Sequence, residues 1–121
     1  MKTNISVMVL DDEPIVGERL KPVLEREGYE VEVFTDSRKA LQRLEEKKFK
    51  VLITDLKMTG PSGLDVLKFL KDKALDTRAI VITGYATIER AREAQVLDAQ
   101  FVTKPFKLEQ IVKLVDKAAK K

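Results

Sequence analysis

Apolar runs and helical patterns alternate along the whole chain and predict five short strands, each followed by a helix. The apolar runs lie at residues 5–10, 30–34, 50–54, 79–83 and 100–103. Between them, apolar side chains recur at helical spacing. We expect helices from near Glu13 to Gly28, from Asp36 or Ser37 onward, and at residues 64–74, 87–97 and 108–119. This alternation is typical of βαβ units and a parallel sheet.

The apolar content of each run predicts the order of the strands. The runs at 5–10, 50–54 and 79–83 are nearly continuous, as in central strands covered by helices on both faces. The run at 30–34 alternates polar and apolar residues, which suits an edge strand. Right-handed crossovers then favour a doubly wound, flavodoxin-like α/β fold, (βα)5, with strand order 2-1-3-4-5. The 121 residues contain no linker signal, so we expect a single domain over 1–121.

Acidic, hydroxyl and basic residues stand where the apolar runs end. Asp11, Asp12 and Glu13 follow the first run, Asp55 follows the third, Thr83 ends the fourth and Lys104 follows the fifth. In a parallel sheet these positions share one edge. Open α/β sheets bind ligands at that edge, where the strand order reverses, here between the first and third strands. The sequence therefore predicts a polar site there.

The residue types of this edge suit a metal-assisted phosphoryl-accepting site. Clustered carboxylates repel one another, and a divalent cation relieves the repulsion. The chain has no His and no Cys, so a metal must be held by oxygen atoms, which favours Mg²⁺. A carboxylate can also act as a nucleophile and form an aspartyl phosphate, and Asp55 is our candidate. Mg²⁺ and Lys104 then neutralise the phosphoryl charge, and Thr83 donates a hydrogen bond.

Each of these residues also has an ordinary structural interpretation. Asp11 and Asp12 can cap a helix, Asp55 can be a turn residue, and Thr83 with Gly84 forms a common strand-to-loop pair. Lys104 before Pro105 is a weak signal alone. The combination is more informative than its parts, because all of these residues fall at successive strand ends of one topology.

Composition limits the classes of function. The net charge of +3 is small and dispersed, which argues against direct nucleic-acid binding. Acidic residues end the first short apolar run, so the N-terminus does not resemble a signal peptide. No run is long enough to span a bilayer. We therefore expect a cytoplasmic protein without a membrane partner.

Five segments together resemble the receiver domain of two-component response regulators, the CheY-like superfamily, from end to end. They are VLDDEP at 9–14, LITDLKM at 52–58, Gly63, ITGYA at 82–86 and TKPF at 103–106. The resemblance implies that Asp55 accepts phosphate from the phosphohistidine of a sensor histidine kinase or a phosphotransfer protein. It implies a signalling domain rather than an enzyme, one that catalyses only its own Mg²⁺-dependent phosphorylation and dephosphorylation.

The resemblance also assigns a role to each site residue. It implies that Asp12, Asp55 and the main-chain carbonyl of Lys57 bind Mg²⁺ directly, while Asp11 acts through water. Thr83 is expected to move toward the phosphoryl group, which Lys104 contacts. Phe101 matches the aromatic switch position that turns inward with that movement. The peptide bond before Pro105 is expected to be cis.

The expected output is a change on one face of the domain. Phosphorylation adds charge at one point and biases a two-state element. That element is expected to be the loop after the strand at 79–83, the helix at 87–97 and the strand at 100–103. The exposed face of this helix, this strand and the helix at 108–119 would then change its affinity for a partner. The face would control a partner or an output domain, and receivers of this kind often form homodimers through it.

The chain departs from the family pattern at a few positions, none of them in the acidic site. Thr59 stands where proline often follows Met58, and Asp98 stands in place of a common glycine. Lys57 and Tyr85 occupy two positions that tune dephosphorylation, and neither can orient an attacking water. We therefore expect a long-lived phosphorylated state, surviving for longer than minutes in the purified protein.

Two other functions stay open on the sequence alone. One is a receiver-like interaction module that never uses phosphate, although the retained acidic residues, Thr83 and Lys104 argue against it. The other is a Mg²⁺-dependent phosphatase with an aspartyl nucleophile. Such enzymes usually carry a further acid/base carboxylate two residues beyond the nucleophile, where this chain has Lys57.

Overall fold

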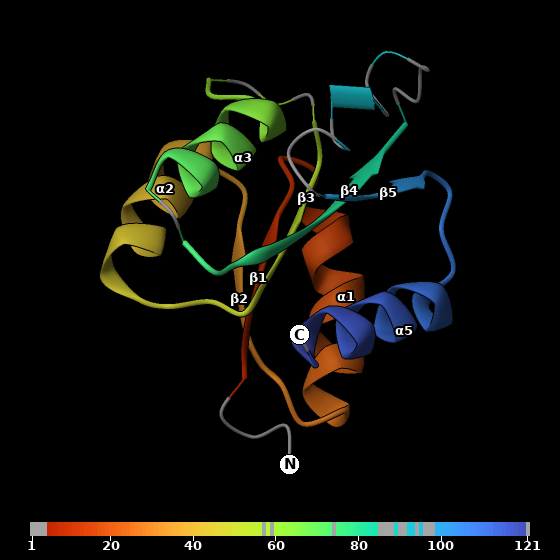
Figure 1. The fold of residues 1–121 in the computed structure, drawn as a ribbon. Helices are drawn as coiled ribbons and strands as arrows, with labels where there is room; N and C mark the ends of the chain where they lie inside the picture. The colour runs from red at the N-terminus through yellow and green to blue at the C-terminus, as the bar shows by residue number, and fades with distance from the viewer. Residues whose placement is uncertain are drawn as a thin grey trace.

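Five parallel strands form one sheet in the order β2-β1-β3-β4-β5, as the sequence predicts (Figure 1). The computed structural model describes residues 5–56, 58, 60–73, 75–84, 89, 92–93, 95 and 99–120. The strands are β1 (Ser6–Leu10), β2 (Glu30–Phe34), β3 (Val51–Thr54), β4 (Arg78–Thr83) and β5 (Gln100–Thr103). The main helices are α1 (Pro14–Arg26), α2 (Ser37–Glu46), α3 (Gly63–Asp72) and α5 (Leu108–Ala119). The helix expected at 87–97 lies largely outside the described residues; positions 89, 92, 93 and 95 are helical.

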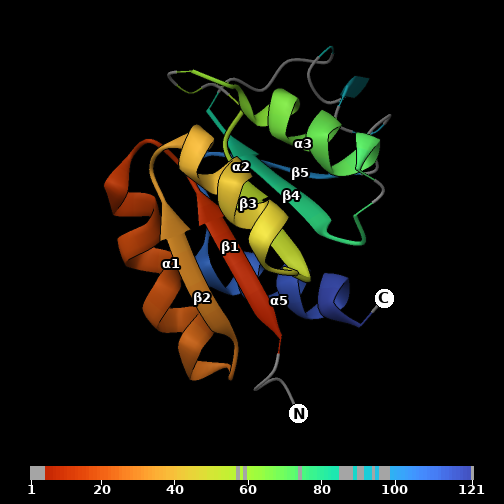
Figure 2. The same ribbon diagram turned by 90° about the vertical axis from the view of Figure 1, so that its left-hand side faces the viewer.

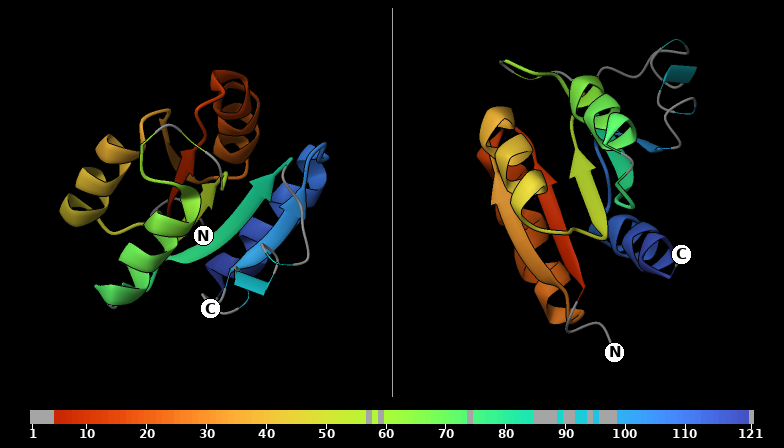
Figure 3. Two further views of the ribbon diagram at one scale, coloured as in Figure 1. Left: turned by 90° about the horizontal axis from the view of Figure 1, so that it is seen from above. Right: turned by 60° about the vertical axis from the view of Figure 1, so that its left-hand side comes forward.

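The sheet is buried between two pairs of helices, α1 with α5 on one face and α2 with α3 on the other (Figures 2 and 3). Alternation along β1 shows how each face is made. Val7 and Val9 join the core beneath α1 and α5, whereas Met8 and Leu10 join the core beneath α2 and α3. All five residues of β1 are buried, which explains why the strand is apolar at every position after Ser6.

Local signals in the sequence account for the helix ends. Pro14 occupies the first turn of α1, where its missing N–H costs nothing, and Gly28 follows the helix at a φ of 97°. The helix continues through Pro22 despite the hydrogen bond that proline removes. Asp36 caps α2 by accepting a hydrogen bond from the Arg38 N–H at 2.9 Å.

The described helices are short compared with a bilayer. The longest is α1, with 13 residues, whereas a membrane-spanning helix needs about 20 apolar residues. Within the described part of the chain, no helix is long and apolar enough to cross a membrane.

Candidate functional site

Asp11 and Asp55 lie side by side because β1 and β3 are adjacent strands in register. Leu10 pairs with Thr54, and each aspartate directly follows its strand. The Asp11 N–H donates to the Phe34 carbonyl at 3.1 Å, and the Asp55 N–H donates to the Leu10 carbonyl at 3.1 Å. These bonds continue the sheet pattern past the last strand residues. The backbone of both aspartates is therefore fixed by the sheet.

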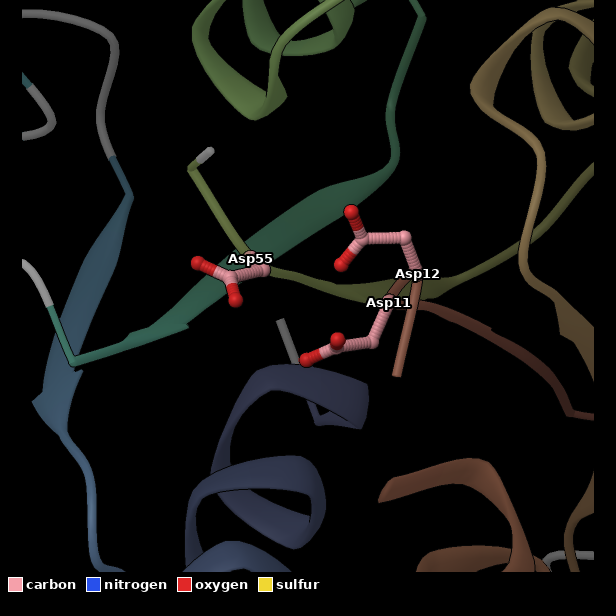
Figure 4. Close-up of side chains that lie close together, drawn as sticks. All are labelled: Asp11, Asp12 and Asp55. Atoms are coloured by element: carbon pink, nitrogen blue, oxygen red, sulfur yellow. The ribbon is translucent and has the colours of Figure 1, made fainter. Parts of the chain in front are cut away.

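The carboxylates of Asp11, Asp12 and Asp55 form a single acidic group at this edge (Figure 4). One oxygen from each lies within 4.8 Å of the others. Asp11 and Asp55 are buried, at 3% and 4% exposure, whereas Asp12 is exposed. Mg²⁺ uses one or two protein carboxylates and completes its shell with water and phosphate oxygens. An oxygen-only group with one exposed member therefore fits a hard divalent cation.

Lys104 joins three carboxylates that are far apart in the sequence. Its Nζ donates to Glu13 Oε1 at 2.8 Å, to Asp11 Oδ2 at 3.0 Å and to Asp55 Oδ2 at 3.0 Å. An ammonium group has three N–H donors, so these bonds use all of them. The site still carries more negative than positive charge, which leaves it suited to a further cation.

Burial and ion pairing act in opposite directions on the pKa values of two groups in the site, Asp11 and Lys104. Burial raises the pKa of Asp11 above its usual range, while the Glu13 N–H and Lys104 oppose this rise. Burial alone lowers the pKa of Lys104, but its bonds to Glu13, Asp55 and Asp11 outweigh that effect and raise the pKa. Lys104 is therefore a permanent positive charge at neutral pH.

Gly63 allows the start of α3 to approach the backbone of the acceptor candidate. A Cβ atom at this position would lie 1.9 Å from the Asp55 carbonyl oxygen and 2.8 Å from Leu56 Cα. The Gly63 N–H also donates to the Leu56 carbonyl at 2.8 Å. The turn after β3 therefore has room only for glycine at residue 63. Gly63 is part of a motif in the sequence, but the sequence alone gives no sign of this steric reason.

The remaining predicted residues lie at the ends of β4 and β5. Thr83 is fully buried, and its carbonyl accepts a hydrogen bond from the Lys104 N–H at 2.8 Å. Phe101 is partly buried against the core beneath α2 and α3. The Lys104–Pro105 peptide bond is cis. Lys57, whose carbonyl is a predicted metal ligand, lies outside the described residues.

One residue of the site had no role in the sequence analysis. Glu13 stands directly after Asp11 and Asp12, and it makes the shortest of the three Lys104 hydrogen bonds. Its place in the acidic run was visible, but the run alone could not show that a lysine 91 residues away reaches it. Lys104 directly follows β5, and only the folded sheet brings it within hydrogen-bond distance of Asp11 and Glu13.

The sequence of this chain matches the family model described as response regulator receiver domain over residues 7–116. The chain belongs to that receiver domain family. The transcriptional regulatory protein FixJ of Rhizobium meliloti is 31% identical over 118 residues, which cover 97% of this receiver chain and 58% of FixJ. The chain thus spans little more than half the length of that relative, which is a transcriptional regulator.

Solved receiver structures share the fold. The solution structure of the beryllofluoride-activated NtrC4 receiver domain dimer is 31% identical with a TM-score of 0.89, covering 95% of this chain and 96% of that one. A response regulator from Burkholderia pseudomallei, solved with a phosphorylated aspartic acid, a calcium ion and citrate, is 29% identical with a TM-score of 0.83. That match covers 97% of this chain and 69% of the Burkholderia chain.

Proposed function

We propose that this receiver domain is a phosphorylation-dependent switch in which Asp55 accepts a phosphoryl group from a phosphohistidine. The donor is a sensor histidine kinase or a phosphotransfer protein, and the setting is the cytoplasm. The observation that carries the proposal is the position of Asp55, which shares an acidic group with Asp11 and Asp12 and lies 3.0 Å from the Lys104 ammonium. A related structure from Burkholderia contains a phosphorylated aspartic acid, which supports the same chemistry here.

The chemistry needs little more than the groups already in place. A carboxylate oxygen of Asp55 attacks phosphorus, the bond from phosphorus to the imidazole nitrogen breaks, and the imidazole keeps the electron pair and takes a proton from water. Lys104 supplies positive charge where the phosphoryl oxygens arrive. Asp12, Asp55 and the main-chain carbonyl of Lys57 would hold Mg²⁺ directly, with Asp11 acting through water, and the cation would neutralise charge on the transferred group.

The proposed output passes through β4 and β5. Thr83 ends β4 beside the site, and Phe101 on the neighbouring strand β5 pairs with Val81 of β4. We propose that a hydrogen bond from Thr83 to the phosphoryl group and a turn of Phe101 change the face formed by residues 87–97, β5 and α5. That change would control a partner, an output domain or a homodimer, the last supported by the activated dimer of the NtrC4 receiver.

Intact-mass measurement after incubation with acetyl phosphate tests the acceptor. We expect one added phosphoryl group that depends on Mg²⁺ and is lost in Asp55→Ala, because the alanine removes the proposed nucleophile and leaves Asp11, Asp12 and Lys104 in place. Asp76→Ala, at an exposed aspartate away from the site, should keep the adduct. No adduct under any condition would favour a phosphate-independent interaction module instead.

A further inference from the structure

The structure assigns to Glu13 a restraining role: it holds the Lys104 ammonium in the resting state and competes with the incoming phosphoryl group for it. This inference rests on the proposed function of Asp55 and adds a positioning residue to it. Glu13 Oε1 lies 2.8 Å from Lys104 Nζ, closer than either aspartate oxygen. Glu13 is therefore a full partner of the lysine.

The hydrogen bonds around Glu13 direct its side chain to Lys104. One Asp11 oxygen accepts the Glu13 backbone N–H at 2.9 Å, and the other accepts Lys104 at 3.0 Å. Glu13 is the N-cap residue of α1, yet its side chain makes no capping hydrogen bond. Asp11 thus places Glu13 beside the lysine, and the Glu13 carboxylate bonds to the lysine rather than to the helix.

The exposure of the three carboxylates shows which one can most easily release the Lys104 ammonium. The side chains of Asp11 and Asp55 are 3% and 5% exposed, whereas that of Glu13 is 61% exposed. All three N–H donors of Lys104 are in use, so a phosphoryl oxygen can gain one only if a carboxylate releases it. Glu13 can be rehydrated after release, while the buried aspartates would lose their partner in a poorly solvated place.

The negative charge of Glu13, like its hydrogen bond to Lys104, opposes the approach of a phosphoryl donor. A phosphoryl donor is an anion, and Glu13 adds one negative charge beside the ammonium that should attract it. Removing the Glu13 side chain frees one N–H donor and removes that charge. Both changes favour the approach of the donor and the engagement of Lys104 with the phosphoryl oxygens.

The test compares Glu13→Ala with Glu18→Ala, which removes the same charge from an exposed position further along α1. We expect Glu13→Ala to raise the rate constant for phosphorylation by acetyl phosphate by about three- to tenfold at low ionic strength. Glu18→Ala should change it by less than about twofold, because its distance and screening weaken the effect.

A second readout needs neither phosphate nor metal. In the metal-free protein, the ¹H–¹⁵N NMR signal of the Lys104 ammonium should be protected from water exchange, and Glu13→Ala should shift it and speed the exchange. The same signal in Glu18→Ala should match the wild type. An unchanged Lys104 signal in Glu13→Ala would contradict the claim that Glu13 binds the ammonium in the resting protein. A changed signal with an unchanged or slower phosphorylation rate would contradict the claim that Glu13 competes with the phosphoryl group for Lys104.

The two readouts separate this inference from the function on which it rests. If the wild-type protein gains no phosphoryl group, the proposed function fails, and the competition fails with it. The NMR comparison still decides whether Glu13 holds Lys104 in the resting protein. If the wild type is phosphorylated and Glu13→Ala behaves as Glu18→Ala does, only the restraining role of Glu13 is wrong.

Discussion

Two clusters of charged side chains in this receiver domain have opposite ratios of cations to carboxylates. In the Lys104 cluster (Lys104 with Asp11, Glu13 and Asp55), one ammonium serves three carboxylates at 2.8 to 3.0 Å. In the Glu32 cluster (Glu32 with Arg43 and Lys47), one carboxylate serves two cations, with Arg43 Nε at 2.8 Å and Lys47 Nζ at 3.0 Å. The first cluster has excess negative charge, and the second has none.

Burial sharpens this difference. Asp11 and Asp55 are almost inaccessible, whereas the side chains of the Glu32 cluster are 29% to 36% exposed. Excess charge is more costly where solvent is excluded, so a domain selected for stability alone would place it outside. The Lys104 cluster therefore keeps an electrostatic cost that a bound cation removes. The Glu32 cluster only joins β2 to α2.

The largest effect should come from a change that keeps every charge and moves the backbone beneath the Lys104 cluster. Gly63→Ala forces a methyl group against the Asp55 carbonyl, so we expect the free energy of unfolding to fall by about 3 kcal/mol. Acetyl phosphate should phosphorylate the remaining folded protein at least about tenfold more slowly, because the Asp55 backbone must shift. Urea unfolding and intact mass measure the two effects.

Gly17→Ala is the matched control for this change. Its new Cβ would lie 2.3 Å from Val33 Cγ1, a comparable clash that falls on a side chain rather than on the Asp55 backbone. A side chain can yield more easily than a backbone, and alanine favours the helix by about 1 kcal/mol. We expect a smaller loss of stability and an unchanged phosphorylation rate. Equal slowing in both variants would mean that general destabilisation, rather than the Asp55 backbone, limits the reaction.

The sequence predicted the strands, their order and the residues that follow the strand ends. Continuous apolar runs identified β1, β3 and β4 as central strands, the alternating run identified β2 as an edge, and the strand order is confirmed. Asp11 and Asp55 were placed at one edge because they follow neighbouring strands. The directions of side chains could not be predicted in this way. Neither the contact of Glu13 with Lys104 nor the close approach of Gly63 to the Asp55 carbonyl has a local sequence signal.

Neutralising one carboxylate should have opposite effects on stability in the acidic site and in the Glu32 cluster. Asp12→Asn removes one negative charge from the group that includes Asp11 and Asp55, so the metal-free protein should gain about 1 kcal/mol in free energy of unfolding. The stabilisation that Mg²⁺ gives the wild type should largely disappear, because a ligand is lost. Thermal unfolding with EDTA and with Mg²⁺ measures both changes.

Asp76→Asn provides the comparison for Asp12→Asn, since Asp76 is an exposed aspartate outside the acidic group. It should leave both the metal-free stability and the response to Mg²⁺ as in the wild type. A loss of metal-free stability in Asp12→Asn would contradict the view that the Lys104 cluster and its surroundings carry uncompensated negative charge.

The smallest expected effect is that of Glu32→Gln, which should destabilise the protein by about 1 kcal/mol or less because the ion pairs of Glu32 with Arg43 and Lys47 are partly exposed.

The hydrogen bond from Arg43, opposed by burial and aided by Lys47, lowers the pKa of Glu32. A carboxylate with a lowered folded-state pKa stabilises the fold above its unfolded pKa and loses that contribution as the pH falls. The difference between wild type and Glu32→Gln should therefore be full at neutral pH and shrink below the ordinary glutamate value of 4.5. Glu45→Gln, at an exposed position on α2, should show no such dependence in urea unfolding across this range. A Glu32 effect that persists unchanged under acid would assign its role to packing, and the contrast with the acidic site would then no longer be one of charge.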